Sequence, residues 1–241
     1  MAIIGDAIKL ITLKALIHVT TKPGATVTFK KGSTTMATKT ANSSGVAELE
    51  VLSGDWGSWT ITGSASPSAS GSASVTLSAP TTYNVTLTLT QYIIQNGNFV
   101  SGFSHSVNAA GQPHAGASYF SDQGDYIELQ TYQGGSNEVV SGYITTGIDM
   151  SGWNTLYIDG CGKGDSGYAG PANNTSDNPP SFSTSVQLFG QIESINSRST
   201  KSLNVSGITG TKYLALRAKA WVWQDEGAGG TIRIYNMYLR N

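Results

Sequence analysis

The chain has 241 residues, of which 14 are basic and 15 acidic, and only 12% are charged, about half of the usual quarter. A net charge of −1 excludes a typical nucleic-acid binder, because such proteins neutralise phosphates with a basic surface. No stretch approaches the roughly 18 apolar residues of a membrane helix, so we expect no membrane insertion. The 29 glycines and 11 tyrosines, with abundant Ser and Thr, are typical of proteins that work outside cells.

The first residues of the chain do not look like a secretion signal. Asp6 lies where such a signal carries basic residues, and Lys9 and Lys14 interrupt the apolar residues that follow. The single cysteine, Cys161, excludes an intrachain disulfide and a cysteine-based zinc site. We therefore expect a protein that folds in a reducing cytoplasm and leaves the cell by lysis, as part of a virus particle.

The first half of the chain is predicted to be a small antiparallel β-sandwich. Residues 8–19 fit either an amphipathic helix or a strand, because β-branched residues are frequent among them. Alternation of apolar and polar residues then predicts five strands, at 25–29, 46–51, 59–62, 73–77 and 83–89. Residues 64–74 are rich in Ser, Ala and Gly and are predicted to form a long surface loop.

The order of these segments carries a resemblance. Gly-Ala-Thr-Val-Thr-Phe at 24–29 is followed by a segment at 38–47 that begins with Thr and ends with Gly-Val-Ala. Leu-Ser-Gly-Asp-Trp comes next, at 52–56. This pattern resembles carboxypeptidase-regulatory-like and related surface Ig-like modules over roughly residues 15–90. The resemblance implies an Ig-like sandwich that serves for attachment or as a spacer and carries no catalysis. The predicted domains are 1–91, with this role, and 92–241.

The second half alternates over longer segments that contain more aromatic residues. The predicted strands cover 125–130, 155–159, 183–188, 201–205, 212–217 and 231–239. The segments 142–156, 203–218 and 230–236 together resemble the galactose-binding-like jelly-roll group, which includes many carbohydrate-binding modules and phage tail domains. The resemblance implies an all-β fold, an Ig-like sandwich followed by a jelly-roll sandwich that binds a ligand or projects from a particle.

Residues suited to catalysis do not form a convincing set. His18 alternates with apolar residues, and His105 and His114 flank a loop, where they are read as loop residues, ligand contacts or a metal site shared between chains. Asp125 and Glu128 are an odd number of residues apart, so on one strand they would point to opposite faces, which disfavours a glycoside-hydrolase pair. We expect no enzyme activity and no cofactor. A structural calcium ion stays open as an alternative, with four acids as available ligands: Asp165, Asp177, Asp225 and Glu226.

The strongest candidates for ligand contacts lie in two loops. Residues 162–180 are predicted to form a long loop, and loops of that length usually act or are disordered. Aromatic rings with amide and carboxylate groups suit sugars, and seven such residues are predicted to bind glycan: Tyr168, Asn173, Asn174, Asp177, Trp223, Asp225 and Glu226. The competing interpretations are an ordered surface loop or a subunit contact for the first loop, and a core strand for Trp221 and Trp223.

The leading functional hypothesis is a non-enzymatic structural or adhesion protein of a bacteriophage, in a tail fibre, a baseplate or a capsid decoration. Its expected partners are other virion proteins, further copies of itself in a homo-oligomer, and a host cell-surface glycan. It would be made in the bacterial cytoplasm and lie on the virion surface. The alternative is a bacterial carbohydrate-binding module or surface adhesin.

Overall fold

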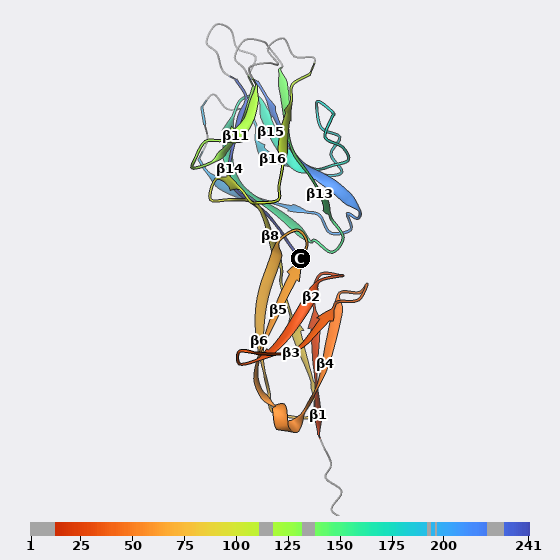
Figure 1. Ribbon diagram of the computed structural model, residues 1–241. Coiled ribbons are helices and arrows are strands. Elements are labelled where there is room, and N and C mark those ends of the chain that lie inside the picture. The colour runs from red at the N-terminus through yellow and green to blue at the C-terminus, as the bar shows by residue number, and fades with distance from the viewer. Residues whose placement is uncertain (1–12, 111–117, 132–137, 192–193, 196, 221–228) are drawn as a thin grey trace, which may run out of the picture. The chain divides into compact units, whose positions relative to one another are not determined.

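A computed structural model of the chain describes residues 13–110, 118–131, 138–191, 194–195, 197–220 and 229–241. These residues form strands, turns and one short 3₁₀ helix, Ser53–Asp55 (Figure 1). The predicted all-β fold, a succession of two β-sandwiches, is confirmed. No helix in this part of the chain has the length and apolar character needed to cross a bilayer.

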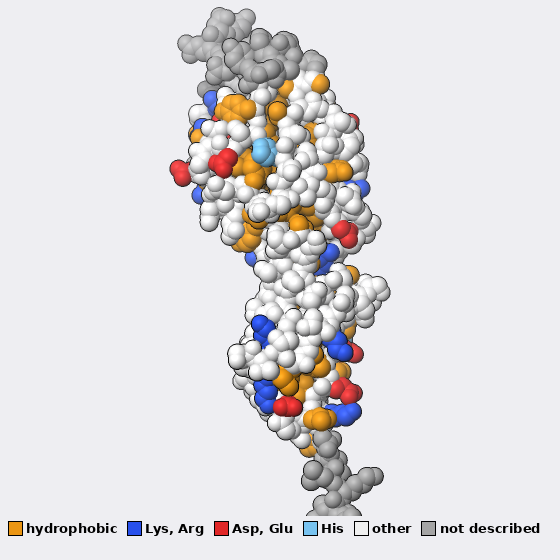
Figure 2. Space-filling model, in the orientation of Figure 1, with side chains coloured by type: hydrophobic (Ala, Val, Ile, Leu, Met, Phe, Trp, Pro, Cys, Tyr) orange, Lys and Arg blue, Asp and Glu red, His pale blue; other side chains and the backbone are white. Residues whose placement is uncertain are grey.

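The chain divides into two compact units. The first runs to Ala65 and includes Ser70–Leu89, and the second comprises Ser66–Ala69 and Thr90–Asn241. The predicted roles of the two parts, attachment for the first and binding or projection for the second, stay predictions. Figure 2 shows few charged side chains on its visible face, where hydrophobic side chains are scattered among the white backbone and remaining side chains.

The first unit is a sandwich of two sheets. Its strands are β1 (Lys14–Thr20), β2 (Thr26–Lys31), β3 (Thr34–Thr40), β4 (Val46–Leu52), β5 (Gly57–Ala65), β6 (Ala69–Leu77) and β7 (Thr82–Thr86). One sheet has the order β4-β1-β7 and the other contains β6-β5-β2-β3. Alternate residues of β1, β2 and β5 are buried and form the core: Ile17, Val19, Val27, Phe29, Trp59 and Ile61.

The structure decides one open alternative in this unit and corrects one prediction. The strand interpretation holds in the part of 8–19 that is described, because β1 begins at Lys14. The predicted loop at 64–74 is wrong: β5 continues to Ala65 and β6 begins at Ala69. Its small residues permit close packing, since a Cβ at Gly71 would lie 2.0 Å from the Thr88 carbonyl oxygen. The Ser, Ala and Gly residues of this segment therefore belong to strands that pack closely against their neighbours, and not to a surface loop.

The second unit contains twelve strands among its described residues. They are β8 (Thr90–Gln95), β9 (Asn98–Phe99), β10 (His105–Asn108), β11 (Tyr119–Asp122), β12 (Ile127–Gln130), β13 (Val139–Asp149), β14 (Thr155–Lys163), β15 (Ser166–Ala172), β16 (Val186–Phe189), β17 (Ser199–Asn204), β18 (Thr211–Lys219) and β19 (Thr231–Arg240). One sheet, here called the five-stranded sheet, has the order β10-β13-β18-β15-β16.

The other sheet of this unit is organised around the last strand. β19 pairs with β14 along its whole length on one edge. On its other edge it pairs first with β12 and then with β8. β17 extends the sheet beyond β14, and β11 extends it beyond β12. We call this the β19 sheet.

The two sheets enclose a core in which glycines make room for large side chains. A Cβ at Gly162 of β14 would lie 2.1 Å from the ring of Phe189, and one at Gly167 of β15 would lie 2.2 Å from it. Because these two strands belong to different sheets, Phe189 fills space between the sheets. Buried alternate residues of β14 and β19 complete this side of the core: Leu156, Ile158, Met237 and Leu239.

Candidate functional site on the tyrosine face

The outer face of the β19 sheet carries a row of tyrosines. Tyr157 of β14 lies opposite Tyr238 of β19, which lies opposite Tyr92 of β8. The Tyr157 and Tyr238 rings stack with centroids 4.9 Å apart, and the Tyr92 and Tyr238 rings are 5.1 Å apart. On each strand the residues immediately before and after the tyrosine are buried. Because side chains alternate along a strand, the tyrosine rings point away from the core. We call this surface the tyrosine face.

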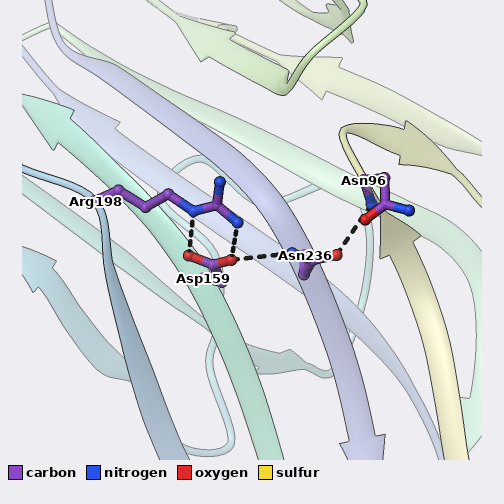
Figure 3. Close-up of polar contacts among 4 residues, drawn as sticks. All are labelled: Asn96, Asp159, Arg198 and Asn236. Atoms are coloured by element: carbon purple, nitrogen blue, oxygen red, sulfur yellow. Dashed lines mark hydrogen bonds and ion pairs between the residues drawn. The ribbon is translucent and has the colours of Figure 1, made fainter.

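A polar cluster lies beside this row (Figure 3). Both carboxylate oxygens of Asp159 accept hydrogen bonds from the Arg198 guanidinium, with an Nε–Oδ1 distance of 2.7 Å. Asn236 donates from Nδ2 to Asp159 Oδ2 at 2.9 Å, and its Oδ1 accepts from the backbone N–H of Asn96 at 3.0 Å. The hydrogen bonds from Arg198 hold the pKa of Asp159 below its usual value against the opposing effect of burial, and Asn236 adds to the lowering. Asp159 is therefore held as an oriented anion.

A β-bulge places two adjacent residues of β19 on this face. Asp159 pairs with Asn236, while the next residue, Gly160, pairs with Ile234, so Tyr235 is the extra residue. Bulges redirect side chains in this way. The Arg198 guanidinium lies over the Tyr235 ring, 4.0 Å from its centroid, as a cation–π contact. The bulge thus allows Arg198 to contact Tyr235 while the neighbouring Asn236 bonds Asp159.

A tight turn fixes Asn96 against the bulge. Asn96 and Gly97 connect β8 to β9 with φ values of 50° and 78°, as two-residue hairpin turns require. The Gly97 amide donates to the Tyr235 carbonyl at 2.8 Å. A Cβ at Gly97 would lie 2.2 Å from the Asp125 backbone, so a side chain does not fit at this position.

Two hollows share Asn96 and Asn236 in their lining. One, of about 340 Å³, has Tyr92 and Tyr238 on its lining together with polar groups from Gln95, Asn96, Asp159, Thr200 and Asn236. The other, of about 320 Å³, is lined by Asn96, Asp125, Arg198, Tyr235 and Asn236. Their size is at the low end of ligand sites. The first combines aromatic surface with hydrogen-bonding groups, which is the chemistry that a pyranose ring requires.

A second ionic cluster lies on the same sheet. Arg233 donates from Nε to Glu128 Oε2 at 2.6 Å, and its guanidinium lies 4.5 Å from the Tyr126 ring centroid. The Tyr119 hydroxyl donates to Glu128 as well. Burial has the largest effect in raising the pKa of this hydroxyl, and the hydrogen bond and negative charge of Glu128 raise it further. The Glu128 carboxylate is therefore occupied by bonds to Arg233 and Tyr119. These contacts do not support a hydrolytic pair of Glu128 and Asp125.

The predicted glycan contacts in 162–180 occupy other positions. About half of the predicted loop is strand: β14 runs to Lys163, and Tyr168 lies within β15, Ser166–Ala172, because small residues there fit the close packing described above. Beyond β15, Asn174 donates to Asp177 Oδ2 at 2.8 Å. Asn173 accepts from Lys212 Nζ at 2.8 Å. The structure thus brings Asn174 and Asp177 together and places Tyr168 apart from them on a strand.

The remaining predicted residues divide between described and undescribed parts of the chain. Trp223, Asp225 and Glu226, like Trp221 and His114, lie outside the described residues, and the seven glycan contacts stay predictions. His18 lies on β1 with Nδ1 2.7 Å from Glu48 Oε1. His105 stacks on Phe99 with ring centroids 4.1 Å apart, and burial lowers its pKa. No group of three metal-binding side chains occurs in the part of the chain that the structure describes.

Sequence reasoning missed the residues of the tyrosine face. Two signals were available. Tyr157 and Asp159 are two residues apart on a strand that was predicted, so they share its polar face. Asn96-Gly97 is a strong hairpin signal.

Comparison with protein families and with curated proteins gave no match. Several solved structures resemble the chain weakly. A family 29 carbohydrate-binding module has a TM-score of 0.40 and 13% identity, covering 64% of this chain and 88% of its own. The K3 cleaved adhesin domain of Lys-gingipain from Porphyromonas gingivalis has a TM-score of 0.39 and 14% identity, covering 62% and 98%. A DUF3823 family protein from Bacteroides ovatus has a TM-score of 0.23 and 12% identity, covering 92% and 97%. Similarities this weak do not indicate a function for this chain.

Proposed function

We propose that the chain is a non-enzymatic carbohydrate-binding protein and that the tyrosine face holds the sugar. The observation that carries the proposal is the hollow of about 340 Å³, where the Tyr92 and Tyr238 rings meet the polar groups of Asp159 and Asn236. An aromatic ring covers the apolar face of a sugar, while fixed amides and carboxylates bond its hydroxyls.

The polar groups are suited to binding and unsuited to proton transfer. Asp159 is kept ionised by Arg198, whereas a general acid needs a pKa raised toward the working pH. A carboxylate offers about four lone-pair positions, and Asp159 uses three in the bonds from Arg198 and Asn236. One position is left for a sugar hydroxyl.

This proposal follows the alternative functional hypothesis from the sequence, a carbohydrate-binding module or adhesin. The phage hypothesis, with virion partners, oligomerisation and a place on the particle surface, stays a prediction. The two are compatible, because a virion protein that attaches to a host can do so through a glycan.

Glycan-array binding by single variants tests the proposal. Tyr92→Ala and Tyr238→Ala should each reduce affinity about tenfold or more, since stacking on one ring is worth about 1–3 kcal/mol in the comparable case of nucleobases. Tyr213→Ala, which removes a partly buried tyrosine from the five-stranded sheet, is the matched control. Full binding by folded Tyr92→Ala and Tyr238→Ala proteins would reject the tyrosine face.

A further inference from the structure

The outer face of the five-stranded sheet holds an arginine with no acceptor. Arg217 of β18 lies in register between Tyr168 of β15 and Ser141 of β13. Its Nε atom is buried and has no hydrogen-bond partner. Its guanidinium lies 5.5 Å from the Tyr168 ring centroid. None of the ion pairs among the described residues includes Arg217.

The polar groups around Arg217 are already paired with one another. Lys219 Nζ lies 2.8 Å from Asp165 Oδ2. The Ser141 hydroxyl donates to Asn178 Oδ1 at 2.7 Å. These contacts do not include Arg217, whose guanidinium lies over the Tyr168 ring and pairs with no carboxylate among the described residues.

An arrangement of this kind reduces stability. A buried N–H without an acceptor loses its hydration and gains nothing in return, and such groups in native proteins call for an explanation. Burying part of a guanidinium is unfavourable until an anion arrives. Replacing a buried ionic group by an apolar side chain of similar volume is often neutral or stabilising, so we expect an apolar residue at position 217 to be at least as stable as arginine.

The chemistry of the vacant donors indicates the ligand. A guanidinium presents N–H groups in a planar fork that matches a carboxylate, with two parallel hydrogen bonds. Arg217 has terminal nitrogens that make no hydrogen bond with the described residues, and its guanidinium lies over the Tyr168 ring. The ring supplies a surface for a sugar ring, as in other aromatic sites. We propose that Tyr168 and Arg217 bind an acidic sugar, with the guanidinium on its carboxylate and the ring of Tyr168 against the pyranose.

This second site lies on a different sheet from the tyrosine face and does not depend on the function proposed there. It also gives Tyr168, predicted from the sequence as a glycan contact, a specific partner. The other polar residues of that prediction, Asn174 and Asp177, bond to each other and are not part of the proposed site.

The test compares uronic-acid oligosaccharides with their methyl esters, which keep the sugar backbone and replace each carboxylate by an uncharged ester. Isothermal titration of the full chain should show binding of the acids at least tenfold tighter than of the esters. Arg217→Gln should abolish this preference and Arg217→Lys should weaken it, because lysine keeps the charge and loses the fork. Lys39→Gln, which removes an exposed charge from β3 of the first unit, is the control and should change nothing.

Two further measurements separate the outcomes. Arg217→Met should lose acid binding while its melting temperature stays equal to that of the wild type or rises. Tyr238→Ala should keep the acid preference. The proposal is overturned if the wild type does not distinguish acids from esters, if Arg217→Gln keeps the distinction, or if only Tyr238→Ala removes it. A lowered melting temperature of Arg217→Met with acid binding intact would also assign Arg217 a structural role.

Discussion

The coupling between Asp159 and Arg198 can be predicted from their exposure. The Asp159 side chain is 14% exposed and the Arg198 side chain 49%. Hydrogen bonds to charged groups contribute about 1.5–3 kcal/mol, whereas fully exposed ion pairs contribute about 0.2–1 kcal/mol. Because Arg198 is half exposed to solvent while Asp159 is largely buried, we expect a coupling free energy between these two ranges, about 1 kcal/mol. In a unit of this size that corresponds to a shift of about 2–4 °C in melting temperature.

A double-mutant cycle measures this coupling. Thermal unfolding of the wild type, Asp159→Asn, Arg198→Gln and the double variant gives the coupling free energy directly. The exposed pair Lys14–Glu50, with side chains 57% and 65% exposed, is the matched control and should couple far more weakly. Equal coupling in the two pairs would refute the argument that partial burial strengthens the Asp159 contact.

The pH dependence of the cycle has a defined sign. The pKa of Asp159 is lowered in the folded protein, chiefly by the hydrogen bonds from Arg198. Its contribution to stability is therefore fully present above the unfolded value of 3.8 and is lost as the pH falls through the lower folded value. The difference in stability between wild type and Asp159→Asn should shrink over that range. A difference that grows as the pH falls would show that the carboxylate is not stabilised by Arg198.

Three further predictions concern packing, chemistry and folding. Phe189→Ala should lower the free energy of unfolding by about 3–5 kcal/mol, measured by denaturant titration. Cys161 should react slowly with a thiol reagent in the native protein at pH 8, because burial raises its pKa. The fragment 90–241 should unfold cooperatively in a thermal melt. It lacks Ser68, to which the Gln91 side-chain amide is hydrogen-bonded in the full chain, so Gln91→Leu should raise the stability of the fragment. A fragment that Gln91→Leu destabilises would contradict this.

Alternation along the chain was sufficient to predict most strands and the buried face of each. Strands predicted at 155–159, 212–217 and 231–239 all lie within strands of the structure. The reason is that burial of one face of a strand imposes a period of two on its side chains. Composition failed where small residues serve packing. Gly162 and Gly167 looked like a loop but accommodate Phe189.

The tyrosine face could not be assembled from the sequence because register is not a local property. Asp159 lies 39 residues from Arg198 and 77 from Asn236. Their meeting depends on β14 pairing with β19 and on a bulge at Tyr235. No periodicity shows which of two strands will be neighbours, and a shift of one residue would reverse every side chain. The sequence shows which side chains of a strand are polar and share one face. Which strands become neighbours, and so which of these side chains meet, depends on the pairing of the strands.

The two outer faces of the second unit differ in how their charges are compensated, and this difference bears on their ligands. On the tyrosine face Asp159 is paired with Arg198, and Glu128 with Arg233. The Arg240 guanidinium also lies over the Tyr157 and Tyr238 rings, 5.5 Å from each centroid. A neutral glycan bound on this face carries no charge of its own, so its affinity should depend little on salt. Arg217 has no such partner, so binding of an acidic sugar at that site should weaken as salt screens the charges. Salt dependence therefore distinguishes a neutral glycan held by the tyrosine face from an acidic one held by Arg217.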